Sequence, residues 1–208
     1  MSGWTKKGSP PPLLASDFSA TTSTKRLLVL TFITSSANKL AEVERLLGRP
    51  LGRESLSVEE IQAVDLDPVV RHKAQQAYAI LRQPVLVEDT GLAFAAWNGL
   101  PGALIKWFLL TLGTEGICRV LRGETNRVAR ATTLFGYCDG TACHLFAGTV
   151  LGVVPAVPRG TRGFGWDALF QPRGSERTFG EMTPEEKDRF SMRRLALERF
   201  RQSGLLDP

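Results

Sequence analysis

Two adjacent carboxylates, Glu88 and Asp89, are the residues whose type and setting first indicate chemistry in this sequence. They follow the apolar run Val85–Val87 and precede Thr90 and Gly91. This order predicts a short buried strand whose end carries charge into a crevice, which is where α/β proteins usually bind ligands. An acidic turn that closes a strand uses the same residue types, so the flanking segments have to decide between the two interpretations.

The loop Thr34–Lys39 is a second candidate site. It follows the apolar run 27–33, which predicts the first central strand, and it precedes a helix expected to end at Gly48. Backbone N–H groups at a helix start, together with hydroxyls and an ammonium, form an anion site that could hold a triphosphate. Plain N-capping by Ser35 or Ser36 is the alternative, and the loop lacks the glycines of a Walker loop.

The segment Pro158–Asp167 combines glycines with two arginines, two aromatic residues and one carboxylate. Glycines let the backbone approach a planar ligand, the rings of Phe164 and Trp166 can stack on a base, and Asp167 can accept hydrogen bonds from it. A structural turn cluster is the rival interpretation. Lys106 is also conspicuous, because an ammonium in an otherwise apolar helix needs a partner or must reach an edge.

The elements that would position these residues alternate between helix and strand patterns. Apolar spacing, proline and a capping box predict helices over 68–81, 103–112, 115–121 and from Thr183 toward Phe190, followed by a last amphipathic helix whose arginines (193, 194, 199 and 201) should form a solvated face. Residues 131–138 and 143–154, joined by an Asp139-Gly140 turn, predict an antiparallel hairpin. Residues 49–67 are expected to form a loop-rich wall with a short extended piece at 58–62. The fold class predicted is therefore α/β with a mixed central sheet.

Composition fits one ordinary globular domain. The chain has 208 residues, 43% of them hydrophobic, and no apolar run reaches the roughly 18–20 residues of a membrane span. We expect a disordered tail over residues 1–25, a single domain over 26–208, a cytoplasmic location and no membrane partner. Net charge +5 weakly favours an anionic ligand. The three cysteines lack CxxC spacing, so reduced core thiols are expected.

Taken together, the motifs resemble the inosine triphosphate pyrophosphatases, a family that removes non-canonical purine nucleoside triphosphates from the nucleotide pool. The resemblance runs in order from about Leu27 to Phe200. Its most specific blocks are Val85–Gly91, Gly99–Gly102 with Ile105–Phe108, and Phe164–Asp167 with Glu186–Lys187 and Ser191–Arg193. The second block is similar to the eukaryotic branch. The shared order and spacing of the blocks carry the resemblance.

The resemblance implies an elongated fold with two lobes, a nucleotide cleft between them and usually a homodimer, with no stable nucleic-acid partner. It also implies Mg²⁺-dependent hydrolysis of ITP, dITP or XTP to the monophosphate and pyrophosphate. Asp89 and Lys39 would be catalytic, and Asp89 and Glu60 would bind metal. Substrate would be held by Thr34, Ser35, Ser36, Asn38, Lys39, Lys73, Thr90 and Lys106 and, around the base, by Phe164, Gly165, Trp166, Asp167, Lys187, Ser191, Met192 and Arg193.

Two departures from the family pattern affect these expectations. The first loop has Ser36 where the family has Asn, with Asn38 two places onward, which alters the expected phosphate grip. The family's Ser-His-Arg triplet reads Ser191-Met192-Arg193 here, and a thioether accepts hydrogen bonds only weakly. We therefore expect weaker discrimination between ITP and GTP than the family pattern implies. The alternatives are a Maf-type nucleotide pyrophosphatase, which the Phe164–Asp167 block disfavours, and a non-catalytic nucleotide- or RNA-binding module.

Overall fold

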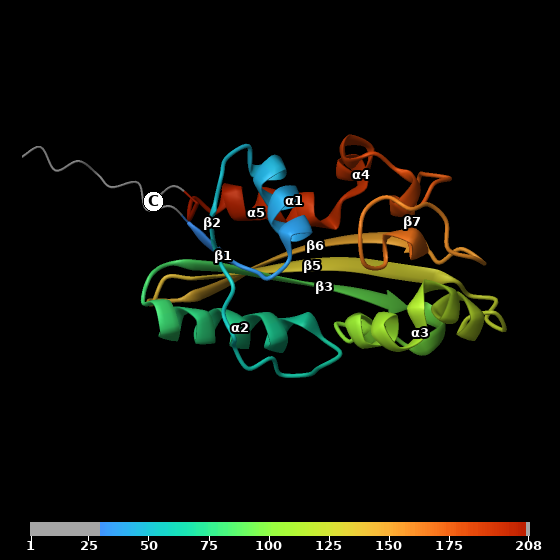
Figure 1. The fold of residues 1–208 in the computed structure, drawn as a ribbon, viewed down its shortest axis with the longest axis horizontal. Coiled ribbons are helices and arrows are strands. Elements are labelled where there is room, and N and C mark those ends of the chain that lie inside the picture. The colour runs from blue at the N-terminus through green and yellow to red at the C-terminus, as the bar shows by residue number, and fades with distance from the viewer. Residues whose placement is uncertain (1–29, 207–208) are drawn as a thin grey trace, which may run out of the picture.

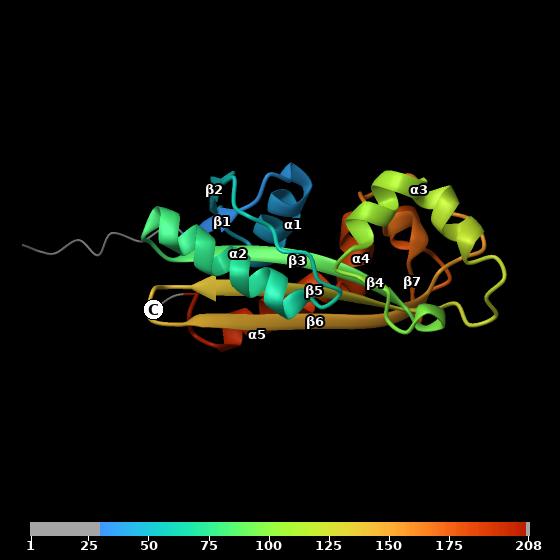
Figure 2. The ribbon, with the colours of Figure 1, turned by 90° about the horizontal axis from the view of Figure 1, so that it is seen from below.

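The computed structural model describes residues 30–206. The tail expected over residues 1–25 and the first part of the strand expected over 27–33 lie outside this range. Three long strands form the spine of the described chain, and helices cover both of their faces (Figures 1 and 2). Among residues 30–206, no helix has the length and apolar character that crossing a bilayer requires.

The central sheet is mixed, as the hairpin pattern predicts. Within the described chain it has seven strands in the order β2-β1-β3-β5-β6-β7, with β4 paired to β3 off that path. The first three pair in parallel and the others are antiparallel. The strands are β1 (Thr31–Ile33), β2 (Gly52–Glu54), β3 (Val85–Phe94), β4 (Pro101–Gly102), β5 (Val128–Cys138), β6 (Cys143–Val153) and β7 (Gln171–Pro172).

Strand β3 corrects the prediction that Glu88 and Asp89 stand at a strand end. The strand continues for 10 residues, and the two carboxylates lie in its middle, opposite Phe135 and Leu134 of β5. The long antiparallel partner supplies hydrogen bonds past the point where the apolar run stops, so pairing rather than hydrophobicity sets the length. Glu88 and Asp89 therefore point to opposite faces of the sheet.

The helices are α1 (Ala37–Leu47), α2 (Leu66–Leu81), α3 (Ile105–Val120), α4 (Pro184–Phe190) and α5 (Met192–Gln202), with short 3₁₀ turns at Ala95–Trp97, Asp167–Leu169 and Phe179–Glu181. Helix α2 begins two residues before the expected Pro68. Gly113, with φ 64°, interrupts α3 and separates its two predicted parts. Thr183 closes the predicted capping box of α4, and Gly48 ends α1 in the left-handed region.

Two layers of helix sandwich the sheet. Helices α1 and α5 lie on one face and α2 and α3 on the other (Figure 1). Alternation along β3 divides the core accordingly, since Leu86 packs with residues of α1 and α5 while Val85 and Val87 pack with residues of α2. A third cluster, built around Leu92, Phe170 and Phe179, packs against α3 at the other end of the sheet.

Three local predictions are wrong. Strand β2 lies in the expected loop-rich wall, whereas the extended piece at 58–62 is not a strand. The hairpin connection comprises residues 139–142 instead of a two-residue turn. Cys138 and Cys143 form a disulfide, because the register of β5 and β6 places them opposite each other at the hairpin end. Cys118 alone is a buried free thiol among the described residues.

Candidate active site

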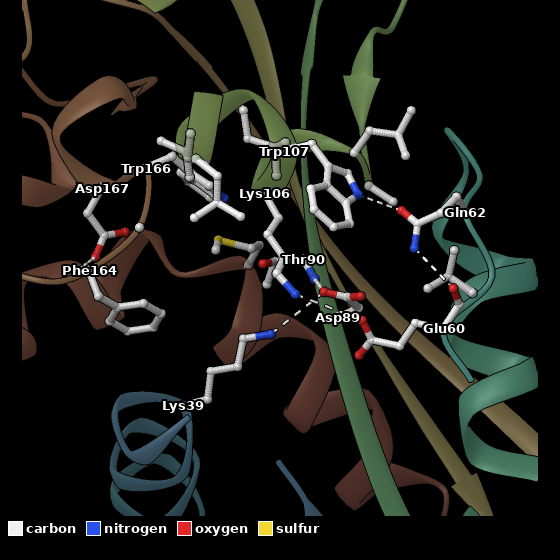
Figure 3. Close-up of a pocket in the computed structure, with 18 of the residues that line it drawn as sticks. Lys39, Glu60, Gln62, Asp89, Thr90, Lys106, Trp107, Phe164, Trp166 and Asp167 are labelled. Carbon is white, nitrogen blue, oxygen red and sulfur yellow. Dashed lines mark hydrogen bonds and ion pairs between the residues drawn. The ribbon is translucent and has the colours of Figure 1, made fainter. Parts of the chain in front are cut away.

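A cavity of about 360 Å³ lies at the middle of β3. Asp89 and Thr90 of β3 contribute one wall, and the start of α3, the segment 60–63, the loop 164–167 and the start of α5 contribute the others, together with Lys39 and Lys187. Figure 3 shows the side chains that face into it. Twelve of the residues expected at the site line this cavity: Lys39, Glu60, Asp89, Thr90, Lys106, Phe164, Gly165, Trp166, Asp167, Lys187, Met192 and Arg193.

Lys39 joins the two carboxylates of the central strand. Its Nζ lies 3.2 Å from Glu88 Oε2 and 3.7 Å from Asp89 Oδ1. The Glu88 side chain is fully buried, whereas that of Asp89 is 29% exposed and faces the cavity. The Thr90 backbone N–H donates to Asp89 Oδ1 at 2.8 Å and fixes that carboxylate. The free face of Asp89 and the Lys39 ammonium therefore meet in the space that a ligand would occupy.

Arg193 is held between two buried carboxylates beneath the cavity. Its guanidinium lies 2.8 Å from Glu88 Oε1 and 2.7 Å from Glu42 Oε1. Burial alone would raise the pKa of both carboxyls, but Arg193 outweighs it, aided by Lys39 at Glu88 and by Lys187 at Glu42, and holds each pKa below its ordinary value. Arg193 is only 1% exposed, so the solvated face predicted for the basic series is wrong at this residue.

Lys187 is the second buried cation of the site. Its Nζ donates to Asp167 Oδ2 at 2.8 Å and lies 3.4 Å from Glu42 Oε2. The same ammonium stands 5.0 Å from the centroid of the Phe164 ring, whose backbone N–H donates to Asp167. Burial raises the pKa of Asp167, with Lys187 opposing. One aromatic face, two cations and a carboxylate thus meet at one end of the cavity.

Glu60 carries the charge on the opposite side of Asp89. Its carboxylate lies 3.5 Å from Lys73 Nζ and 3.9 Å from Lys106 Nζ. In Figure 3 the carboxylates of Glu60 and Asp89 point toward each other. Lys106 reaches the edge, with its side chain 66% exposed. The sequence pattern predicted that this ammonium would either have a partner or reach an edge, and it does both.

Six of the expected residues do not line the cavity. Ser36 caps α1 by accepting from the Lys39 backbone N–H at 3.2 Å, and Thr34 Oγ1 accepts from the Ser36 N–H at 3.1 Å. Ser191 is fully buried and caps α5. The prediction that Ser35 or Ser36 caps the helix is therefore confirmed for Ser36. The loop still stands at the start of α1. The six residues outside the cavity lining are Thr34, Ser35, Ser36, Asn38, Lys73 and Ser191.

Sequence reasoning missed Glu42 and the apolar wall of the cavity. Glu42 is 6% exposed and pairs with both Lys187 and Arg193, although it stands in α1 far from them along the chain. Its position one turn after Lys39, on the same helix face, was the available signal. The wall residues, which include Leu104, Trp107 and Leu110, carry no chemistry in the sequence alone.

Comparison with known proteins decides the family. A model of the Ham1 family matches residues 30–203. The chain belongs to the Ham1 family. A protein of similar sequence, the inosine triphosphate pyrophosphatase of Yarrowia lipolytica, is 45% identical over 176 residues, which cover 82% of this chain and 92% of that protein.

Two solved structures share the fold of this chain. The Ham1 protein of Staphylococcus aureus shares the fold with a TM-score of 0.74, at 21% identity and over 84% of this chain and 96% of that one. A protein of Mycobacterium abscessus, described as a nucleoside-triphosphatase or dITP/XTP pyrophosphatase, gives a TM-score of 0.65 at 25% identity, over 86% of this chain and 98% of that one. The mixed twisted sheet with flanking helices is thus the fold of Ham1 proteins.

Proposed function

We propose that this member of the Ham1 family hydrolyses non-canonical purine nucleoside triphosphates, namely ITP, dITP and XTP, to the monophosphate and pyrophosphate, with Mg²⁺, and so cleanses the nucleotide pool. The observation that carries the proposal is the meeting of Asp89 and Lys39 in one cavity with the Phe164–Asp167 loop. The names of the Yarrowia and Mycobacterium relatives support the substrate class. The homodimer, the cytoplasmic location and the division into two lobes stay predictions.

The phosphate chain would lie across the middle of the cavity. A triphosphate brings about four negative charges, and its cleavage depends mostly on positioning and electrostatic neutralisation. Lys39 lies beside Asp89, and Lys106 stands at the cavity edge, where each can neutralise phosphate oxygens. Lys73 is 15% exposed and pairs with Glu60. It would therefore affect the phosphates indirectly, by fixing the position of the Glu60 carboxylate.

Asp89 is the group placed to act on water. The oxygen of one water molecule bonds to the α-phosphorus while the bond from that phosphorus to the bridging oxygen breaks, and pyrophosphate leaves with the electron pair. Asp89 orients the water and accepts its proton, since the carboxylate is partly exposed and fixed by the Thr90 N–H. Glu88 cannot share this role, because its side chain is fully buried and its carboxylate is paired with Arg193 and Lys39.

The residues present fit a magnesium ion. Within residues 30–206 no group of three or more His, Cys, Asp and Glu residues forms a metal cage. Mg²⁺ does not need one, because it commonly binds through one or two carboxylates, water and substrate phosphates. Asp89 and Glu60, whose carboxylates face each other in Figure 3, would hold it. Bound there, the ion would supply charge neutralisation and lower the pKa of a coordinated water.

The base would lie at the Phe164 end of the cavity. The Phe164 ring offers a stacking surface, and Lys187 and Arg193 stand 5.0 Å and 5.7 Å from its centroid. Both cations are donors only, so they match the 6-oxo group of a purine and meet a 6-amino group unfavourably. Met192 lines the same end and is 2% exposed. This arrangement supports selection of a 6-oxo purine and leaves the Met192 position without a strong hydrogen-bonding group.

The test is pyrophosphate release from ITP, XTP, dUTP and GTP with Mg²⁺, by the native chain and by Asp89→Asn. We expect Asp89→Asn to lower kcat for ITP by about 100-fold or more, because the amide keeps the size and loses the proton acceptor. Glu59→Gln, which alters an exposed carboxylate outside the cavity, is the matched control. Full activity in Asp89→Asn would contradict the catalytic role. Binding of ITP without pyrophosphate release by the native chain would favour a non-catalytic nucleotide-binding protein.

A further inference from the structure

The cavity extends past Asp89, away from the proposed base site. In Figure 3, Phe164 and Asp167 lie on one side of Asp89 and Glu60 and Gln62 lie on the other, with Trp107 above Asp89 and hydrogen-bonded to Gln62. A purine at Phe164 with its α-phosphate at Asp89 would direct its terminal phosphate toward this second side. The cavity lining includes Trp107 and the apolar residues that adjoin Gln62 in the chain or lie three residues from Trp107, namely Ile61, Ala63, Leu104 and Leu110. The terminal phosphate of a free triphosphate is charged, so it would make no favourable contact with these apolar side chains.

Trp107 is an exposed aromatic residue that is fixed in place. Its Nε1 donates to Gln62 Oε1 at 2.6 Å, and Gln62 Nε2 donates to the Glu60 carbonyl oxygen at 3.0 Å. Trp107 is nevertheless 49% exposed, and Leu110, one helical turn onward, is 69% exposed. A ring held in this way can stack on a ligand at a small cost in side-chain entropy. The hydrogen bonds also tie the ring to the segment that carries Glu60.

Cationic charge stands beside this ring. Lys106 Nζ lies 5.6 Å from the centroid of the Trp107 ring and 3.9 Å from Glu60 Oε2. A terminal phosphate paired with Lys106 would therefore bring any group esterified to it against Trp107. The charge and the apolar wall together match an aromatic ring joined to a phosphate, which neither a free phosphate nor a plain hydrocarbon would satisfy.

We propose that the walls formed by Ile61, Ala63, Leu104, Trp107 and Leu110 are a subsite for an aromatic group carried on the terminal phosphate of the nucleotide. This inference rests on the proposed function. The substrate class it adds is that of purine nucleoside triphosphates bearing an aryl or second nucleoside group on the γ-phosphate. Water attacks the same α-phosphorus and the same bridging bond breaks. The leaving group is then a nucleoside diphosphate, or an aryl pyrophosphate, in place of pyrophosphate.

Binding of matched esters tests the subsite without relying on hydrolysis. The probes are the γ-phenyl and γ-methyl esters of α,β-methylene-ITP, which have equal charge and differ in the ring, with affinities measured by calorimetry. The native chain should bind the phenyl ester at least about fivefold more tightly. Trp107→Ala and Leu110→Ser should each reduce that preference, Trp107→Ala to less than about twofold, and Trp107→Phe should keep most of it. Equal affinities in the native chain would overturn the proposal.

A second measurement separates this inference from the proposed function. The native chain is given ITP and, separately, diinosine triphosphate, and we expect IMP with pyrophosphate from the first and IMP with IDP from the second. ITP hydrolysis with equal ester affinities would retain the function and reject the subsite. A phenyl preference without ITP hydrolysis would retain the subsite and reject the function. Dimerisation lost in Leu110→Ser, together with equal ester affinities, would assign this wall to a second copy of the chain instead.

Discussion

At the scale of single residues, the site is built on ion pairs whose side chains are almost completely buried. Arg193 and Lys187 lie 1% and 6% exposed, and each contacts Glu42. Burying a charge without a partner costs folding free energy. These two cations can therefore stand at the proposed base site only because each is paired with buried carboxylates. The consequence for function is that the donors proposed to read the purine are rigid. The substrate meets them already oriented, with little side-chain ordering left to supply.

Met192→His tests how the base is discriminated. Met192 lines the cavity beside Arg193 and is nearly fully buried, so its thioether contributes contact area and only a weak acceptor. An imidazole there would add a specific hydrogen bond toward the base. We expect the ratio of kcat/KM for ITP to that for GTP to rise by about 5–10-fold in the variant, as one hydrogen bond would produce.

The measurement is steady-state pyrophosphate release from both nucleotides by the two proteins. Met182→His, which changes a buried methionine outside the cavity lining, serves as the control for the effect of the imidazole on the core. An unchanged or smaller ratio in Met192→His would contradict the expectation that the thioether weakens discrimination.

The sequence predicts the chemistry of individual residues better than their partners. Asp89, Lys39 and Phe164 could be singled out because their types suit a nucleotide, and all three line the cavity. Glu42 could not, because a glutamate in an amphipathic helix usually faces solvent and only the packing of α5 against α1 buries this one. Pairing between residues 145 positions apart, as between Glu42 and Lys187, is a property of the tertiary structure and leaves little trace in local pattern.

At the scale of elements, the close contact between α5 and β6 sets the position of Arg193, one of the two cations proposed to read the base. Gly148 of β6 faces the first turn of α5, and a Cβ atom at this position would meet the Met192 carbonyl oxygen, the Ala196 nitrogen and the Leu195 side chain. The helix backbone therefore rests directly on the sheet. Met192 and Arg193 stand at the point where that contact is made.

Gly148→Ala should push α5 away from the sheet. Backbone atoms are the obstacle, so the strain cannot be relieved by rotating a side chain, and we expect a loss of about 1–3 kcal/mol in the free energy of unfolding. Urea unfolding measures this loss, and ITP hydrolysis should fall with it because Met192 and Arg193 move. Gly123→Ala is the control, since a Cβ there meets nothing within 4 Å. A Gly148→Ala protein of native stability and activity would show that the helix seat is not rigid.

Elements are predictable where local chemistry ends them. The cap at Ser36, the stop at Gly48 and the box at Thr183 all mark helix ends that the structure confirms. Element length fails where pairing takes over, as in β3, which continues through the two carboxylates because β5 lies along it. The disulfide between Cys138 and Cys143 was missed because the prediction of reduced thiols rested on the lack of CxxC spacing, although the predicted hairpin already ends one strand at Cys138 and begins the next at Cys143.

At the scale of the whole molecule, the buried charges link folding to pH. Glu42 and Glu88 have pKa values below their ordinary 4.5, because Arg193 and its neighbouring lysines outweigh the effect of burial. Such carboxyls stabilise the fold fully above about pH 4.5, and the stabilisation is lost as pH falls through the lowered pKa values. Burial raises the pKa of Asp167 above 3.8, so its contribution has the opposite sign and is lost as pH rises through that raised pKa.

Among the buried carboxyls, Glu42 and Glu88 have a lowered pKa and Asp167 a raised one, which predicts net destabilisation in acid. We expect the midpoint of thermal unfolding to fall as the pH drops below about 4.5, because protonation of Glu42 and Glu88 leaves Arg193 buried without these anionic partners. Glu42→Gln should unfold at a lower temperature at pH 6 and show a shallower fall over the acid range, because one of the two buried carboxyls of lowered pKa is gone. Glu59→Gln, an exposed carboxylate, should keep the native slope. A midpoint that holds or rises on acidification would mean that Asp167 dominates and that the charges around Arg193 do not stabilise the fold.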